Sequence, residues 1–247
     1  MIKILKDIIR HTYSLGGISF IKLEGRQVKA MSDDNSIVVR GTLNDNIFGS
    51  DGSKVGLANL PTLKNFLEFP SFNEDEAKVF FMKTKNKDGV EYPRCIIFTS
   101  GENHKVQYNL MSAEQADARI KVPKMANLSA DISIVPTQKN LKDLQYFNGA
   151  MSSYSKLFNV VTNNGTLEFH LGDENSCQAV VPVSKNVLGT LNKEVFFPVL
   201  PVINVLKLMG EDTCTSLSIV GNAGMVIEMV SPYGEYHFML PSKKKIA

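Results

Sequence analysis

Two short stretches place lysines at a spacing that an α-helix would gather onto one face. KILKDI covers residues 3–8 and KNLKDL covers residues 139–144. Positions i, i+3 and i+7 share a helix face, and flexible ammonium groups on it can hold phosphates without reading bases. A solvated helix face shows the same pattern, so both interpretations stay open. The residues at these positions are Lys3, Lys6 and Arg10, then Lys139, Lys142 and Tyr146.

Two further lysines are weaker candidates for the same role. Lys64 lies in LPTLKNFLEF, close to Glu68, and Lys207 lies in LPVINVLKLM. We expect these two side chains to be solvated first and phosphate contacts second. Asp7 and Asp143, beside the stronger lysines, also temper the positive field.

Two acidic stretches, DDNS and DENS, could hold magnesium as the paired carboxylates of a nuclease do. Both recur where one strand turns into the next, and there Asp and Asn side chains cap their own backbone. The turn interpretation is therefore favoured over the metal site. The residues of the nuclease alternative are Asp33, Asp34, Asp173 and Glu174.

The remaining reactive side chains form no pattern of a catalytic centre. The four histidines are scattered, the three cysteines have no zinc spacing, and no phosphate-binding glycine loop or GxSxG stands in the sequence. We expect no enzyme activity, metal or cofactor. The odd cysteine count is typical of a reducing cytoplasm, and MIKILKDIIRH is neither a signal peptide nor a membrane span. A net charge of +2 requires that any nucleic-acid contact come from charge gathered on one surface.

The sequence segments that position these residues occur twice along the chain. KILKDI and KNLKDL lie 136 residues apart. Three later pairs share an offset of 140: Gly25 with Gly165, DDNS with DENS, and LPTLKNFLEF with LPVINVLKLM. Matches in one order and nearly one register indicate a duplicated domain.

Each copy is expected to contain two helices and six strands, which is an α+β fold of two tandem helix-plus-antiparallel-sheet modules. The helix periodicity covers residues 2–14 and 137–151, and second helices begin near Leu60 and Leu200 with Pro in the first turn. Asn59 is the expected cap of the first of these. Residues 113–131 have no clear period, so we expect an exposed connector and set the domains at 1–115, 116–130 and 131–247. The expected strands are 18–24, 27–32, 36–43, 76–84, 94–100, 105–111, 157–162, 166–171, 177–183, 216–222, 225–231 and 235–241.

The whole pattern resembles a DNA polymerase sliding clamp, the superfamily of proliferating cell nuclear antigen. ADARI at residues 116–120 is similar to a stretch of the T-even-type phage clamps, and FMLPSK at 238–243 is similar to the ending of the nuclear antigen. The resemblance implies a homotrimer closed head-to-tail into a ring, which encircles double-stranded DNA and acts as a polymerase processivity factor. Its implied partners are DNA polymerase and a clamp-loader ATPase at replication forks, in a host cytoplasm if the protein is viral. Transcription proteins also use the ring in T-even-type phages, and whether they do here is open.

The resemblance also implies two protein-binding surfaces. Here the connector is shorter and more basic than in cellular clamps, and the acidic tail is missing. The implied subunit interface comprises Val106, Tyr108, Leu110, Ala179, Val181 and Val183. The implied partner-peptide groove comprises Val122, Pro123, Met125, Leu128, Met225, Phe238, Leu240 and Pro241.

Three alternatives remain beside the ring. One is an accessory factor of the same fold that grips DNA without encircling it, and another is the magnesium nuclease described above. The third is a structural phage protein with duplicated sheets. The oligomeric mass separates the ring from the monomeric factor.

Overall fold

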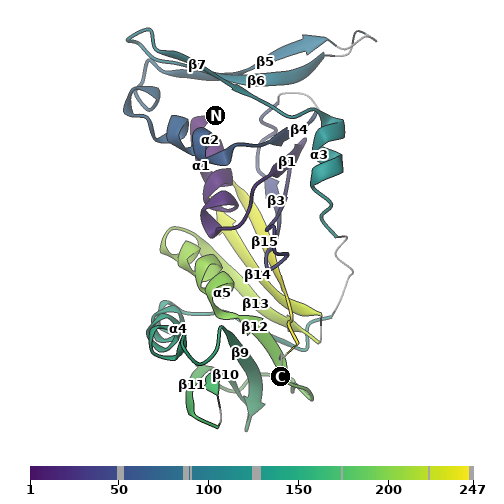
Figure 1. The fold of residues 1–247 in the computed structure, drawn as a ribbon, viewed down its shortest axis with the longest axis vertical. Helices are drawn as coiled ribbons and strands as arrows, with labels where there is room; N and C mark the ends of the chain where they lie inside the picture. The colour runs from purple at the N-terminus through teal and green to yellow at the C-terminus, as the bar shows by residue number, and fades with distance from the viewer. Residues whose placement is uncertain are drawn as a thin grey trace. The chain divides into compact units, whose positions relative to one another are not determined.

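A computed structural model describes residues 1–48, 53–85, 89, 91–123, 129–173, 175–221 and 223–244 (Figure 1). The chain forms two compact units. The first comprises Met1–Asp33, Val39–Pro123 and Tyr233–Glu235, and the second comprises Asp34–Val38, Lys124–Pro232 and Tyr236–Ala247. The domain limits expected from the sequence remain a prediction.

The first unit begins with helix α1 (Ile2–Arg10), whose Leu5, Ile8 and Ile9 are buried. The sequence predicted this helix to residue 14, but the α-helix ends four residues earlier and is followed by the 3₁₀ turn η1 (Tyr13–Leu15). Gly16 and Gly17 follow with φ of +89° and +71°, a backbone conformation that a helix cannot include.

Two antiparallel sheets complete the first unit with helix α2. In one of them, the strands that belong to this unit follow the order β4-β1-β2-β3, and the other sheet has the order β5-β6-β7. Phe98 of β6 packs against Phe66 of α2 and Phe72 of η2, with ring centroids 5.9 and 5.6 Å apart. The elements are β1 (Ile21–Glu24), β2 (Gln27–Met31), β3 (Val38–Leu43), β4 (Lys54–Leu57), α2 (Leu60–Glu68), η2 (Pro70–Phe72), β5 (Lys78–Lys85), β6 (Glu91–Thr99) and β7 (Lys105–Asn109).

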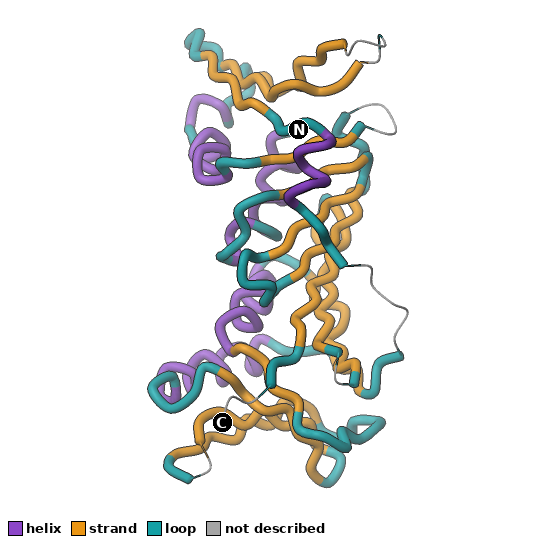
Figure 2. The backbone as a smooth tube through the Cα atoms, turned by 45° about the vertical axis from the view of Figure 1, so that its right-hand side comes forward, coloured by secondary structure: helices purple, strands orange, loops and turns teal. Residues whose placement is uncertain are grey.

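The second unit repeats this arrangement. One sheet has the order β11-β10-β9-β12, and helices α4 and α5 lie on one side of it (Figure 2). The other strands of this unit are neighbours in the order β15-β14-β13-β8. The elements are β8 (Ile132–Ile134), α4 (Gln138–Met151), β9 (Leu157–Asn163), β10 (Thr166–Asp173), β11 (Cys177–Ser184), β12 (Val195–Pro198), α5 (Val199–Leu206), η3 (Lys207–Gly210), β13 (Thr213–Val220), β14 (Gly224–Ser231) and β15 (Gly234–Pro241).

The predicted α+β fold with a duplicated helix-and-sheet module is confirmed. Strand order β3-β2-β1-β4 corresponds to β11-β10-β9-β12, and β5-β6-β7 corresponds to β13-β14-β15. The residue register of the repeat differs by one from the sequence comparison. The tight turn at Gly25 corresponds to the one beginning at Asn164, and α2 begins at Leu60 where α5 begins at Val199, so the spacing is 139.

The connector was expected to be irregular, but its first part is helix α3 (Ala113–Arg119). Ser112 and Gln115 form a capping box, in which the Ser112 Oγ accepts the Gln115 N–H at 3.3 Å and the Gln115 Oε1 accepts the Ser112 N–H at 3.1 Å. The buried Ala116 packs on Gly56 of β4, where a Cβ would lie 3.1 Å from the Ala116 Cβ.

Ion pairs attach α3 to the sheet beneath it. The Asp117 carboxylate of α3 pairs with Lys22 of β1 and, at 3.0 Å, with Lys54 of β4. Lys54 also lies 3.5 Å from Glu24, which pairs with Lys29 at 2.9 Å. Together these five side chains form a continuous chain of ion pairs across β2, β1, β4 and α3.

Three short strands were missing from the sequence prediction. These are β4, β8 and β12, of four, three and four residues. Asn59 does occupy the position before α2, but its side chain makes no capping bond because its backbone is left-handed, with φ of +53°. Among the described helices, none has the length and apolar character that a membrane span requires.

Candidate nucleic-acid interface

The candidate DNA-contacting residues lie on paired helices, one pair in each unit. Helix α1 packs against α2, and α4 packs against α5. Each helix buries an apolar stripe and leaves its polar stripe outside, because apolar residues recur every three to four positions. Each of the two helix pairs therefore has a polar face that points away from its own core.

On α1, Lys3 and Lys6 are both exposed, on the face opposite Leu5 and Ile8. The Lys6 Nζ donates to the Asn73 Oδ1 at 2.5 Å, a neutral partner that leaves the positive charge uncompensated. Lys3 and Lys6 are therefore a pair of cations on one helix face, as the sequence predicted.

Arg10 differs from these lysines. Its guanidinium pairs with the buried Asp7 carboxylate at 3.0 Å, and only 25% of its side chain is exposed. His11 lies on the other side of that carboxylate, 3.4 Å from it. Arg10 is thus held in a local cluster with Asp7, which reduces the charge that it can offer to a phosphate.

Helix α4 starts with a capping box between Thr137 and Asn140 and buries Leu141 and Leu144. Lys139 is 81% exposed and forms an ion pair with Asp143 one turn later. Lys142 is exposed and forms no ion pair with another described residue. An exposed i,i+4 pair is weak, so a phosphate can compete for Lys139.

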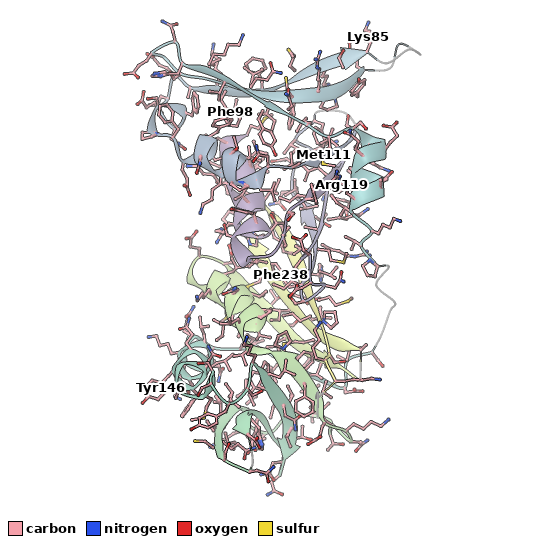
Figure 3. The ribbon with its side chains drawn as sticks, viewed as in Figure 1. Lys85, Phe98, Met111, Arg119, Tyr146 and Phe238 are labelled. Atoms are coloured by element: carbon pink, nitrogen blue, oxygen red, sulfur yellow. The ribbon has the colours of Figure 1, made fainter. Side chains whose placement is uncertain are left out.

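Tyr146 takes the position that Arg10 has in the first copy. It is 75% exposed and points away from the unit, as Figure 3 shows. Its ring contacts Phe147 edge-on, with centroids 5.4 Å apart. An exposed aromatic ring beside two lysines adds contact area to a cationic face without adding charge.

The weaker candidates are also solvent-accessible. Lys64 lies 3.6 Å from the Glu68 carboxylate, and the two side chains are 41% and 61% exposed. Lys207 opens η3 and is exposed, and it forms no ion pair among the described residues. Together with Lys3, Lys6, Lys139 and Lys142, these two residues give three solvent-accessible lysines to α1 and α2 and three to α4 and η3.

The acidic stretches are turns, as the sequence favoured. The Asp34 Oδ1 accepts the Ser36 N–H at 3.0 Å, and the Asp173 Oδ1 accepts the Asn175 N–H at 2.9 Å. Asp33 accepts a hydrogen bond from the Ser19 hydroxyl at 2.6 Å. Glu174 lies outside the described residues. The turn interpretation is confirmed, and Asp34 rather than Asp33 corresponds to Asp173, again 139 residues apart.

The predicted groove residues divide into core and surface. Met225, Phe238 and Leu240 are fully buried, and Figure 3 labels Phe238. Successive side chains of a strand point to opposite faces, so Pro241 of β15 lies on the other face and is half-buried. Val122 is half-buried, Pro123 is exposed, and Met125 and Leu128 lie outside the described residues.

The predicted interface strands both end their sheets. β7 pairs only with β6, and β11 pairs only with β10, among the described strands. Tyr108, Ala179 and Val181 face the core, while Val106, Leu110 and Val183 are half-buried. The Tyr108 hydroxyl donates to the Ala58 carbonyl, and burial raises the pKa of Tyr108. The groups of these strands that a neighbouring subunit could contact are therefore the main chain and the side chains that point away from the core. Val180 is one of these side chains and is 44% exposed.

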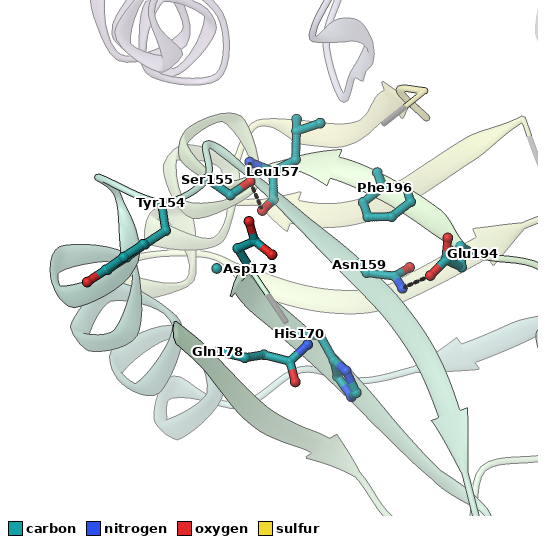
Figure 4. A pocket seen from close by; sticks show the side chains of 10 residues that line it. Tyr154, Ser155, Leu157, Asn159, His170, Asp173, Gln178, Glu194 and Phe196 are labelled. Carbon is teal, nitrogen blue, oxygen red and sulfur yellow. Dashed lines mark hydrogen bonds between the residues drawn. The ribbon is translucent and has the colours of Figure 1, made fainter. Parts of the chain in front are cut away.

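A polar depression of about 240 Å³ lies on the sheet of the second unit, which the sequence did not predict (Figure 4). Tyr154, Asn159, His170 and Glu194 are among its lining residues. The Asn159 Nδ2 donates to the Glu194 Oε1 at 3.4 Å, and His170 lies 2.9 Å from Glu168. These polar groups form hydrogen bonds to one another, which is typical of a surface hydrogen-bond network.

Comparison with solved structures identifies the fold. The chain superimposes on A. fulgidus PCNA, solved with the C-terminal region of FEN-1, with a TM-score of 0.69 and 12% identity over 100% of this chain and 97% of that one. PCNA from Entamoeba histolytica gives a TM-score of 0.65 at 14% identity, over 98% and 94% of the two chains. PCNA from Thermococcus kodakaraensis gives 0.65 at 11% identity, over 98% and 97%. No family profile and no curated protein sequence matches the chain.

Proposed function

We propose that this chain, which has the fold of PCNA over its full length, is a sliding clamp. Three copies close head-to-tail into a ring around duplex DNA and keep a polymerase on its template. The observation that supports this best is the duplicated pair of helices, each with exposed lysines at matching positions. Lys3 corresponds to Lys139, and Lys6 corresponds to Lys142.

The proposed mechanism is topological, and the chain itself performs no chemistry. Lysines on the helices meet the phosphate backbone through flexible ammonium groups, without contacts to base edges. Such contacts depend on salt and are exchanged readily as the duplex moves past them. A ring that cannot dissociate from circular DNA keeps a bound polymerase at high effective concentration.

Closure of the ring is proposed to use the strands that end their sheets. β7 of one subunit would pair with β11 of the next, because each has unpaired main-chain groups on one side among the described residues. A head-to-tail contact generates a ring when its rotation closes. Three subunits of two units each would then give six similar segments around the hole.

The remaining assignments are proposals that rest on the same fold. Val122 and Pro123 of the connector are proposed to contact the polymerase and the ATP-driven loader. Pro241 of the last strand, which follows the buried Phe238 and Leu240, is proposed as another contact with them. The ADARI stretch, which here forms most of α3, supports a T-even-type phage origin and hence a role in viral replication in the host cytoplasm.

Topological linkage tests the proposal directly. Subunits are mixed at low concentration with nicked circular duplex, concentrated to assemble the ring, and separated from free protein in high salt. We expect the protein to remain on circular DNA and to leave it after a single restriction cut. Equal retention on circular and linear DNA would show the non-encircling factor instead.

The nuclease alternative is tested in the same reactions. Magnesium is added without a restriction enzyme, and the circular DNA is examined for breaks. We expect intact DNA. Cleavage that disappears in Asp173→Ala would contradict the clamp mechanism and identify a metal-dependent enzyme.

A further inference from the structure

Among the described residues of the first unit, no strand corresponds to β8 of the second unit. In the second unit, β8 pairs antiparallel with β13, with Ile132 opposite Ile219 and Ile134 opposite Leu217. In the first unit β5 takes the place of β13 in the strand order. Among the described strands none pairs with the outer side of β5, which runs along the edge of its sheet (Figure 1).

Burial shows the effect of the missing strand. Within β13, Cys214, Leu217 and Ile219 are buried. None of the eight residues of β5 is buried, although VFFM lies at its centre. Phe80 is 45% exposed and Met82 is 38% exposed. A long edge strand with exposed aromatic and thioether side chains is a ready template for strand addition.

A pocket of about 440 Å³ lies beside this edge. Its lining includes Met1 and Ile2 at the start of α1, Phe72 of η2, and Val79 and Phe80 of β5, together with the charged side chains of Glu74 and Lys78. In the second unit, β8 ends three residues before α4 begins, so that strand leads into the helix. The pocket thus lies between the helix start and the sheet edge, where the second unit has β8.

Charge indicates what kind of segment fits this edge. β5 has Lys78, Lys83 and Lys85, all exposed, and no carboxylate. None of the three forms an ion pair with another described residue. Lys85, at the end of the strand, points outward in Figure 3.

Edge lysines commonly protect a sheet from pairing with its own copies, since like charges would face each other. They do not oppose a strand of the opposite charge. The structure's own β8 supplies the apolar pattern of such a strand, with Asp131 directly before Ile132-Ser133-Ile134.

We propose that the open edge of β5 binds an extended acidic segment of a partner protein as an added antiparallel strand. Main-chain hydrogen bonds to β5 provide the affinity, apolar side chains at alternate positions cover the exposed Phe80 and Met82 and enter the pocket, and carboxylates meet the three lysines. This surface contains none of the helix lysines and no residue of β7, although Asn73, which lines the pocket, accepts the hydrogen bond from Lys6. It operates whether or not the chain encircles DNA.

The probe is a fluorescein-labelled peptide that has ADISIV, residues 130–135 of this chain, between pairs of glutamates. We expect saturable binding to the full-length protein by fluorescence anisotropy. Hydrogen exchange should show added protection in β5 and none in β11. The double variant Lys83→Glu with Lys85→Glu should bind at least about tenfold more weakly, because two attractive pairs become repulsive.

Two controls make the result specific. Lys121→Glu with Lys193→Glu makes the same charge change at exposed residues that are not part of β5, and this variant should bind the probe as the wild type does. Phe80→Thr keeps a strand-forming residue and should also weaken binding, with circular dichroism reporting an intact fold.

Three outcomes would overturn the proposal. The first is no binding at millimolar peptide. The second is equal binding by the β5 and control variants. The third is a change in oligomeric mass caused by Lys83→Glu with Lys85→Glu, which would identify a second copy of the chain as the occupant.

Discussion

At the scale of single residues, the helix lysines differ in how much charge they can offer. Lys3, Lys142 and Lys207 have no ion pair among the described residues, and Lys6 contacts only a neutral amide. Lys139 shares its charge with Asp143, and Arg10 is held by Asp7. We therefore rank Arg10 below the lysines as a DNA contact.

The combined variant Lys3→Ala, Lys6→Ala, Lys139→Ala and Lys142→Ala should bind a short linear duplex more weakly. The plot of log K against log salt concentration has a negative slope, and each lost phosphate contact reduces the steepness of that slope by about 0.9. We therefore expect the slope to become shallower by about 2 to 4 per subunit. Anisotropy titrations at several salt concentrations measure it.

The matched control replaces four exposed lysines elsewhere, Lys83, Lys85, Lys121 and Lys193, by Ala. It makes the same change in net charge and should leave the salt slope nearly unchanged. An equal fall in both variants would mean that general charge, and not the helix face, governs binding.

Residue types and spacing predicted the helix lysines, because a period of 3.6 fixes which face is polar. They could not predict that Arg10 would be tied to Asp7, since that depends on which side chain the fold buries. Nor could they predict that Phe238 and Leu240 would be buried in the core and not exposed on a partner-binding surface. A strand that is buried on one face looks the same in sequence whichever face receives a partner.

At the scale of elements, ion pairs attach α3 to its sheet more than buried apolar surface does. Its single buried side chain is Ala116, and Asp117 joins it to Lys22 and Lys54. Hydrogen bonds from Lys22 and Lys54 lower the pKa of Asp117, and the hydrogen bond from Lys29 lowers the pKa of Glu24. The hydrogen bond to Asp117 raises the pKa of Lys54.

Attachment of α3 should therefore depend on pH. A carboxylate whose pKa is lowered by folding adds stability above its unfolded pKa, about 3.9 for Asp, and that stability is lost as the pH falls through the folded pKa. Hydrogen exchange of α3, corrected for intrinsic rates, should show protection falling below about pH 4.

Asp117→Asn provides the comparison for this prediction. In that variant α3 should be poorly protected at neutral pH already, while α4, held by its buried leucines, remains protected. Full protection of α3 in Asp117→Asn would show that the ion pairs are dispensable.

The sequence predicted long, periodic elements better than short ones. It missed β4, β8 and β12 because three or four residues carry too little alternation to identify a strand. It also missed α3, although Ser112 followed by Gln115 is the capping-box signal and was available in the sequence.

At the scale of the whole molecule, the repeat is the feature that the sequence predicted most fully. We expect the oligomer to sediment at about 82 kDa, three times the 27.3 kDa chain. Val180→Glu on β11 should shift it toward the monomer, because a charge would enter the proposed strand pairing.

Leu188→Glu is the matched control for this shift, since Leu188 is 91% exposed and lies outside β11. It should leave the mass unchanged. A wild-type chain that sediments as a monomer at micromolar concentration would remove the ring from the proposal.

The one-residue difference in register has a practical meaning for protein engineering. The first hairpin turns through Gly25 and Arg26, of which Gly25 has a positive φ. The second hairpin turns through Asn164 and Gly165, and both of these residues have a positive φ. A symmetrised chain, built by grafting one half's hairpin onto the other, must be spliced at Gly25 against Asn164. Splicing glycine onto glycine would slide each grafted strand by one position and turn its apolar side chains outward.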